Sequence, residues 1–467
     1  MSYNLSDIQE VLTHIPEYMG NALNILTQLS KYFFLILIMQ FALEDYTYFG
    51  KRTEERKRKV IRKQISVIYL FTILGFILIF LNSGSLPVLA TLAGTCVFYF
   101  VTLHGYRLLY PRSSMLLVNN MLMLLAIGFV MISRLDPDNG MKQFVIAAGG
   151  VICAFIIPVI VRKLRILSKL TWLYAAVGII ALLGVLALAT ISRGAKLSVT
   201  IGGISFQFSE LVKITLVFFM ASKLSKDTSF KSVVATSVVA GLHVVILVLS
   251  TDLGTALVFF VAYIVVVFVA THRTIYPLAG LAGGSLASIA AYFLFGHVRQ
   301  RVEAWKNPFL VYDTSGYQIA QGLFAIGAGG WFGTGLFRGR PETIPIAAKD
   351  FIFAAICEEF GGIFAMCLIL VCMSMFLLIV NISMEIKKNT FYKLVAIGLG
   401  AEYAFQVFLT IGGVTKFIPM TGITLPLVSY GGSSVMSTII LIAIIQGLYI
   451  LREDEGAEIE KKKIRRG

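Results

Sequence analysis

The stretch of sequence that decides the fold is STDLGTALVFFVAYIVVVFVAT, residues 250–271. After Asp252 it runs for 19 residues without a charged side chain. A bilayer core about 30 Å thick needs roughly 20 mostly apolar residues to cross it as a helix, so this stretch predicts a membrane span. The whole chain shares this character, because 57% of its 467 residues are hydrophobic and only 14% are charged. We therefore predict an all-α polytopic membrane protein, and we exclude a disordered chain and a small disulfide scaffold.

The same length criterion, applied outward from this stretch, predicts about 13 transmembrane helices. The first predicted span is interrupted by Lys31, and the seventh is short and carries Glu210 and Lys213. The predicted spans are 24–43, 65–82, 86–104, 114–133, 143–161, 170–191, 207–222, 232–250, 253–271, 275–295, 353–381, 394–412 and 430–451.

A basic, proline-containing link at residues 105–114 divides the predicted spans into two groups. The three spans before this link hold few polar residues, whereas the ten spans after it hold the unusual ones. We expect residues 1–110 to form an N-terminal membrane extension and residues 111–452 to form the functional core, with a long extracytoplasmic loop at 296–352. Residues 453–467 are expected to form a basic cytoplasmic tail.

The net charge of +15 is distributed unevenly between the two sides of the predicted membrane. Segments on the side of the C-terminus hold 27 Lys and Arg residues, and segments on the opposite side hold 11. Since basic loops stay in the cytoplasm, we expect a cytoplasmic C-terminus and an N-terminus outside. The basic stretches 51–63 and 461–467 predict contacts with anionic lipids. No aromatic residue accompanies them, so no nucleic acid is expected as a partner.

Cysteine and histidine patterns predict no metal site. None of the five cysteines forms a CxxC pair, and the five histidines have no HExxH or other ligand spacing. Residues 1–22 carry no Lys or Arg, so no cleavable signal peptide is expected.

An ionisable residue inside a predicted span indicates a structural or functional role, because its insertion costs roughly 2.5–3.5 kcal/mol at the bilayer centre. Glu210 and Lys213 are three residues apart, so they share a helix face and can pair, and Ser209 lies on that face too. Two interpretations stay open: the pair lines a polar cavity that contacts substrate, or it is a structural ion pair that ties helices together. Asp252 precedes a predicted helix, where a carboxylate caps the free N–H groups.

Two further segments are too irregular or too polar for a simple span. The loop 296–352 combines aromatic side chains, mixed charges and the glycine-rich stretch 327–335. This combination suits an amphiphile with an anionic head and sugar rings, and the loop is expected to fold against the membrane surface. The stretch IPMTGITLPLVSYGGSS (418–434) holds two prolines and three glycines at membrane depth, so it is expected to be non-helical and buried in protein or lining a cavity.

Five motifs in chain order resemble those of the SEDS family (shape, elongation, division and sporulation), whose members include RodA, FtsW and SpoVE. The resemblance covers about residues 114–451. The motif residues are Gly194–Lys196 with Gln207–Lys213, Thr251–Ala256, Arg301–Pro308 with Gly316–Gln318 and Ala325–Gly335, Asp350–Gly361, and Pro419–Ser434.

This resemblance implies a peptidoglycan glycosyltransferase of cell division, elongation or sporulation in the bacterial cytoplasmic (plasma) membrane. Members of the family polymerise lipid II on the outer membrane face, with a class B penicillin-binding protein and other divisome or elongasome membrane proteins as partners. A sugar hydroxyl displaces a lipid pyrophosphate with inversion, which needs a base and groups that stabilise the leaving charge. No residue spacing indicates a bound cofactor. A divalent cation, Mg²⁺ or Mn²⁺, would be compatible with the pyrophosphate leaving group.

The resemblance also implies which residues contact the substrate. They are expected to be Arg193, Lys196, Gln207, Ser209, Glu210, Lys213, Asp252, Arg301, Tyr317, Gln318, Asp350, Glu359, Ser429 and Ser433.

One position departs from the family pattern. The family's aspartate lies four residues after the asparagine of Asn-Pro, and this position is Val311 here. Asp313 is the only carboxylate between Glu303 and Glu342, and it shares a side with Val311 where the backbone is extended. We therefore expect Asp313 to be the catalytic base. The alternatives are a flippase for a lipid-linked cell-wall precursor and a catalytically silent scaffold.

Overall fold

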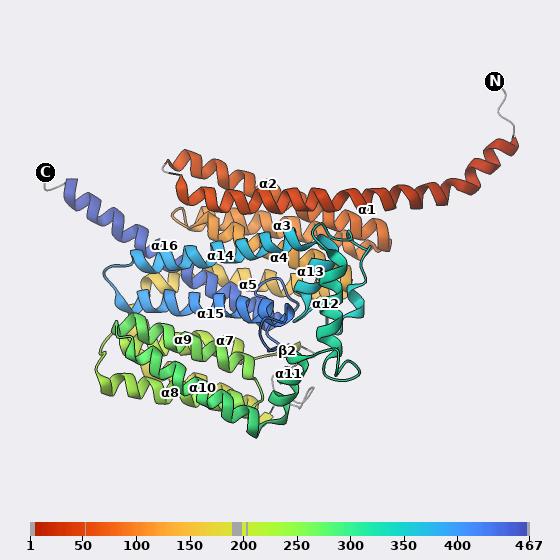
Figure 1. The fold of residues 1–467 in the computed structure, drawn as a ribbon. Helices are drawn as coiled ribbons and strands as arrows, with labels where there is room; N and C mark the ends of the chain where they lie inside the picture. The colour runs from red at the N-terminus through yellow and green to blue at the C-terminus, as the bar shows by residue number, and fades with distance from the viewer. Residues whose placement is uncertain (1–4, 52, 189–198, 202–203, 465–467) are drawn as a thin grey trace.

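The computed structural model of the chain describes residues 5–51, 53–188, 199–201 and 204–464. Its architecture is a bundle of helices with one antiparallel hairpin of two short strands (Figure 1). The elements are α1 (Leu5–Gly50), α2 (Glu54–Ser83), α3 (Leu86–Leu109), α4 (Met115–Leu135), α5 (Pro137–Lys163), η1 (Arg165–Lys169), α6 (Thr171–Leu188), β1 (Val199–Ile201), β2 (Ile204–Phe206), α7 (Ser209–Leu224), α8 (Phe230–Leu249), α9 (Leu253–Thr271), α10 (Ile275–Leu294), α11 (Gly296–Lys306), α12 (Tyr317–Gly329), η2 (Pro341–Thr343), α13 (Ile352–Phe360), α14 (Gly362–Glu385), α15 (Thr390–Val414) and α16 (Gly432–Ile464).

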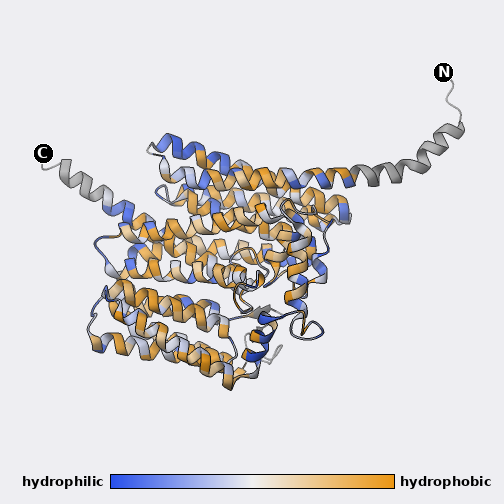
Figure 2. Ribbon diagram, in the orientation of Figure 1, coloured by the Kyte–Doolittle hydropathy of each residue, from blue (hydrophilic) through white to orange (hydrophobic). Residues whose placement is uncertain are grey.

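Twelve helices among the described residues are long and apolar enough to cross a membrane. This finding confirms the predicted all-α polytopic class. The twelve helices coincide with twelve of the predicted spans, and the remaining prediction, 207–222, corresponds to α7, which has only 16 residues. Hydrophobic residues lie along the long helices and hydrophilic residues gather at their ends, as expected for a membrane-spanning bundle (Figure 2).

The connections between the long helices lie on two opposite sides of the bundle. The α1–α2 connection lies on the same side as the C-terminal end of α16, whereas α11, α12 and α13 lie on the opposite side (Figure 1). The long loop predicted at 296–352 thus contains two helices of its own, α11 and α12.

The predicted span 353–381 begins too early, because the chain breaks at Gly361 into the short helix α13 and the spanning helix α14. Gly361 has a positive φ of 92°, and a Cβ there would lie 2.3 Å from the backbone nitrogen of Gly333. The backbone of the 330–333 turn passes this close because Gly362 N–H donates to Gly330 O at 2.8 Å. Only glycine fits this conformation and this approach. The tertiary contact therefore ends a helix that the apolar sequence alone would continue.

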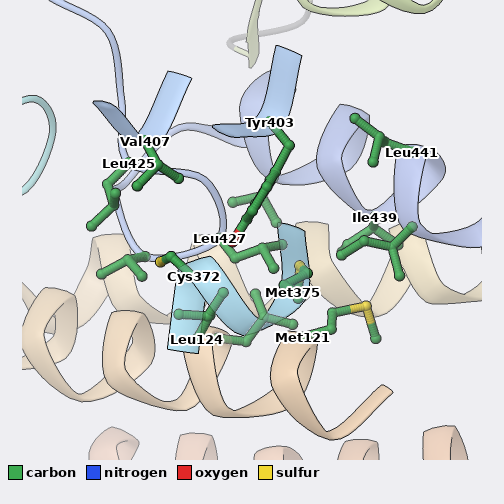
Figure 3. Packing of buried hydrophobic residues seen from close by; sticks show 14 of the residues in the cluster. Met121, Leu124, Cys372, Met375, Tyr403, Val407, Leu425, Leu427, Ile439 and Leu441 are labelled. Atoms are coloured by element: carbon green, nitrogen blue, oxygen red, sulfur yellow. The ribbon is translucent and has the colours of Figure 1, made fainter. Parts of the chain in front are cut away.

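Helix α4 lies at the centre of the core, and 94% of its membrane window is buried. Figure 3 shows Met121 and Leu124 of α4 packed near side chains of α14, α15 and α16. The same hydrophobic core includes the N-terminal helices, since Phe34 of α1 and Phe71 of α2 pack against Phe360 of α13. The predicted division at residue 110 falls between α3 and α4, and the core is continuous across it.

Residues 415–431, called the buried loop below, connect α15 to α16 without a helix. Its second half, residues 423–431, is buried or half-buried, as predicted for an irregular segment at membrane depth. The loop reaches α4 at Gly128, where an added Cβ would lie 2.7 Å from Val428 O and 2.9 Å from Leu427 O. The close approach of two backbones therefore depends on a glycine.

Replacing Gly128 with alanine is expected to destabilise the fold by about 1–3 kcal/mol, because the new methyl group meets backbone atoms that cannot rotate away. The measurement is thermal unfolding of the purified chain in detergent. Gly241→Ala in α8 is the matched control, since a Cβ there meets no atom within 4 Å. Equal melting temperatures for the two variants would contradict the proposed contact.

Candidate functional site

A buried ion pair joins three helices near one end of α7. Lys213 Nζ donates to Glu210 Oε2 at 2.6 Å and to Gln406 Oε1 of α15 at 3.0 Å. Ser437 Oγ of α16 donates to Glu210 Oε2 at 2.9 Å. The pairing of Glu210 with Lys213 predicted from their spacing is confirmed. Both side chains are nearly inaccessible to solvent, so the pair ties α7, α15 and α16 together.

A second buried carboxylate, Glu402 of α15, faces the same ion pair. It is 0% exposed, and neither of its carboxylate oxygens has a hydrogen-bond partner among the described residues. Its electrostatic neighbours are Lys213, which attracts it, and Glu210, which repels it. Sequence reasoning missed Glu402 and Gln406. The signal was present, because Glu402 is an ionisable residue inside the predicted span 394–412.

Asp252 organises a second polar cluster at the start of α9. Its Oδ1 accepts from Thr255 N–H at 3.2 Å, which confirms the predicted N-cap. Its Oδ2 accepts from Gln207 Nε2 and from Ser209 Oγ, each at 3.3 Å. Burial raises the pKa of Asp252 above its usual value, against the opposing effect of these hydrogen bonds. The carboxylate therefore fastens the N-terminal end of α7 to α9.

The cluster continues into α16 and α11. Ser433 Oγ accepts from Gln207 N–H at 2.9 Å. Arg301 of α11 interacts electrostatically with Asp252 and Asp350, while burial lowers the pKa of its guanidinium. Arg301 also donates to Thr421 O of the buried loop at 3.1 Å. Gln207, Ser209, Asp252, Arg301, Asp350 and Ser433 are therefore brought together, as the sequence predicted, and we call these six residues the Asp252 cluster.

Three other predicted substrate residues hold the protein together instead of facing open space. Ser429 Oγ donates to Lys349 O at 2.6 Å and accepts from Leu425 N–H at 2.8 Å. Gln318 Nε2 donates to Pro345 O at 2.8 Å. Glu359 Oε1 accepts from Arg134 at 3.0 Å and from Phe337 N–H at 2.9 Å. These contacts fix the connections around α12 and α13. Tyr317, by contrast, is exposed, and its ring meets that of Tyr312 edge-on at 5.2 Å.

The extended backbone on which we based the equivalence of Asp313 and Val311 is not observed. Residues 311–316 form a turn, closed by hydrogen bonds from Thr314 N–H and Gly316 N–H to Val311 O. Because the chain turns, Val311 packs against the hydrophobic core and Asp313 is exposed. No hydrogen bond or ion pair among the described residues joins Asp313 to the Glu210–Lys213 pair or to the Asp252 cluster. The Asp313 carboxylate therefore lies on the exposed surface of this turn.

Two predicted residues, Arg193 and Lys196, lie outside the described residues. Within the described part of the chain, no three His, Cys, Asp or Glu side chains are grouped so that they could hold a metal ion. The arrangement offers a half-buried cation, Arg301, near two carboxylates, and one exposed carboxylate, Asp313, on a separate turn.

Residues 108–453 match the family model of cell cycle proteins that combines FtsW, RodA and SpoVE. Peptidoglycan glycosyltransferase RodA of Mycobacterium tuberculosis is 34% identical over 387 residues, which cover 74% of this chain and 81% of RodA. Stage V sporulation protein E of Bacillus subtilis is 32% identical over 354 residues, which cover 71% of this chain and 94% of that protein.

A solved structure has the same fold. One chain of a peptidoglycan synthase complex, described as coordinating polymerization and crosslinking, superposes with a TM-score of 0.63 at 26% identity. The superposition covers 72% of this chain and 97% of that chain.

Replacing Lys213 with methionine is expected to destabilise the fold by about 3–5 kcal/mol, because the Glu210 carboxylate is left buried without its cation. The double variant Lys213→Met/Glu210→Gln should recover at least half of the lost stability, since it no longer contains the carboxylate to which Lys213 donates directly. Thermal unfolding in detergent measures both. If the double variant is as unstable as the single one, the cost does not come from the unpaired carboxylate.

Stability should depend on pH through Glu359, which lies in the short helix α13 outside the candidate membrane spans. Burial raises the pKa of Glu359 from 4.5 to about 7, against the opposing charge of Arg134. The folded chain therefore binds this proton more tightly than the unfolded chain, so its contribution is complete below pH 4.5 and is lost as the pH rises through about 7.

Glu359→Gln is expected to flatten the fall in melting temperature between about pH 4.5 and 7. Glu342→Gln is the control, because Glu342 also contacts Arg134 but is 59% exposed. A pH profile that changes equally in both variants would contradict the assignment to Glu359.

Proposed function

Because the chain belongs to the family of cell cycle proteins that includes RodA, FtsW and SpoVE, we propose that it is a peptidoglycan glycosyltransferase that polymerises lipid II into glycan strands. The observation that carries the proposal is the 34% identity to a peptidoglycan glycosyltransferase over 81% of that relative's length. The Asp252 cluster supports it, because it gathers the predicted polar residues on the side of the bundle where α11 and α12 lie (Figure 1).

The reaction that we propose is a single displacement with inversion. The hydroxyl oxygen of the acceptor sugar forms a bond to the anomeric carbon of the donor. The bond from that carbon to the pyrophosphate oxygen breaks, and its electron pair leaves with the pyrophosphate. The hydroxyl proton passes to a carboxylate base, a step that is typically worth about 10²–10⁴-fold in rate.

Asp313 is the base that we propose. Its support is its position, because it is exposed on the 311–316 turn and no described residue engages its carboxylate. The turn itself is well fixed. Gln321 Nε2 donates to Tyr312 Oη at 2.8 Å, and a Cβ at Gly316 would lie 2.1 Å from Pro308 O. A carboxylate on such a turn can meet a sugar hydroxyl that approaches from the membrane surface.

The buried groups take supporting roles in this proposal. Arg301 is the cation of the Asp252 cluster, and its half-buried position suits the stabilisation of a developing negative charge. Glu210 and Lys213 are positioning residues, because their contacts with Gln406 and Ser437 hold the helices that carry the cluster.

We also propose the orientation and the partner. The excess of basic residues on the side of the C-terminus supports a cytoplasmic C-terminus and an outward-facing Asp252 cluster. The structural similarity to a chain of a peptidoglycan synthase complex that coordinates polymerization and crosslinking supports a class B penicillin-binding protein as partner.

The test is polymerisation of purified lipid II by the full chain together with its transpeptidase partner, with glycan product resolved on a gel. Asp313→Asn is expected to lower the rate by about 10²–10⁴-fold. Asp138→Asn should leave the rate unchanged, because Asp138 is an exposed aspartate at the start of α5.

Each other outcome overturns a specific part of the proposal. Full activity of Asp313→Asn would remove Asp313 as the base, and a rate increase in Val311→Asp would point to position 311 instead. If the wild type makes no polymer but moves lipid II across vesicle membranes, the protein is a flippase. If it does neither, it is a silent scaffold.

A further inference from the structure

A cavity of about 640 Å³ lies between α1 and α2, far along the chain from the Asp252 cluster. It is formed by the C-terminal part of α1, the α1–α2 connection and the first turns of α2. This part of the chain precedes residues 108–453, the region that matches the family, so similarity to the family says nothing about it. Its volume falls within the range of about 300–1,000 Å³ that is usual for small-molecule sites.

The cavity is strongly basic. Lys51, Arg56, Lys59 and Lys63 line it, and Glu44 is its one acidic lining residue. Lys63 Nζ forms an ion pair with Glu44 Oε1 at 2.7 Å. Among the described residues, the other three cations form no ion pair. Three positive charges therefore repel one another around one cavity, and an anionic ligand would relieve this repulsion.

An apolar ridge leads from the charged end of the cavity along α1. Ile36, Met39 and Leu43 line the cavity, and their spacing of three and four residues places them on one face of the helix. They are 59%, 41% and 65% exposed. A free inorganic anion would use the cations and leave this ridge uncovered. A ligand with an anionic head and an acyl chain would cover both.

The cavity also lies at the right depth for a lipid head group. The candidate span in α1 ends at Gly50 and the next helix begins at Glu54, so the cations sit where the chain leaves the membrane. Figure 2 shows hydrophilic residues at the start of α2 and hydrophobic residues farther along both helices. Basic residues at this boundary attract anionic lipids.

We propose that the cavity between α1 and α2 is a binding site for one anionic phospholipid, with its phosphate among Lys51, Arg56 and Lys59 and an acyl chain along Ile36, Met39 and Leu43. This site is separate from the proposed glycosyltransferase site. It gives the N-terminal extension a lipid-binding function that does not depend on peptidoglycan synthesis.

The test is a titration of the full chain in detergent with phosphatidylglycerol, with bound lipid counted by native mass spectrometry. Phosphatidylcholine and inorganic phosphate are the other two ligands. Arg56→Gln/Lys59→Gln removes two lining cations. Arg58→Gln/Arg62→Gln removes the same charge from the same helix, but neither residue lines the cavity. Melting without added lipid verifies that both variants fold.

The lining variant is expected to bind phosphatidylglycerol at least about tenfold more weakly than the wild type, whereas the control variant should change binding by less than about twofold. An equal loss in both variants would show diffuse attraction to the basic surface and overturn the site. Equal binding of phosphatidylcholine, or full occupancy by inorganic phosphate alone, would overturn the assignment to an anionic lipid.

Discussion

The buried loop imposes the constraint on which the arrangement of the helices depends. Part of its backbone lies inside a helical bundle where water cannot satisfy the N–H and C=O groups, and each unsatisfied group costs about 1–3 kcal/mol. Side chains from three helices supply the missing partners. The pairs are Arg301 with Thr421 O, Gln406 with Thr424 O, Thr410 with Ile423 O, and Gln143 with Ser429 O. Helices α5, α11 and α15 must therefore keep their positions around the loop.

Two of these side chains also belong to the ionic groups of the candidate site. Arg301 donates to Thr421 O of the buried loop and interacts electrostatically with Asp252 and Asp350. Gln406 Nε2 donates to Thr424 O of the buried loop, and Gln406 Oε1 accepts from Lys213 Nζ. A change in the shape of the loop would therefore alter the surroundings of both ionic groups. The ionic groups and the irregular segment are far apart in the sequence, and these shared side chains couple them in the fold.

The sequence predicted what depends on local composition. Apolar runs located the spans, and the prolines and glycines of 418–434 located the irregular segment, because both signals act within one stretch of chain. It did not predict what depends on distant contacts. The break at Gly361 follows from the approach of the 330–333 turn, and the outward position of Asp313 follows from hydrogen bonds that close a turn at Val311. Neither contact leaves a periodic pattern in the sequence.

The N-terminal extension also holds these connections in place, because α1 reaches both sides of the bundle (Figure 1). Near one end, Lys31 Nζ donates to Gly333 O at 3.0 Å, beside the break at Gly361. Arg338 donates to Asn24 Oδ1 at 3.0 Å in the same region. The other end forms the basic cavity. Phe34 of α1 also packs against Phe360 of α13. A ligand that stabilises the α1–α2 pair therefore also stabilises the helix that contacts the connection between α12 and α13.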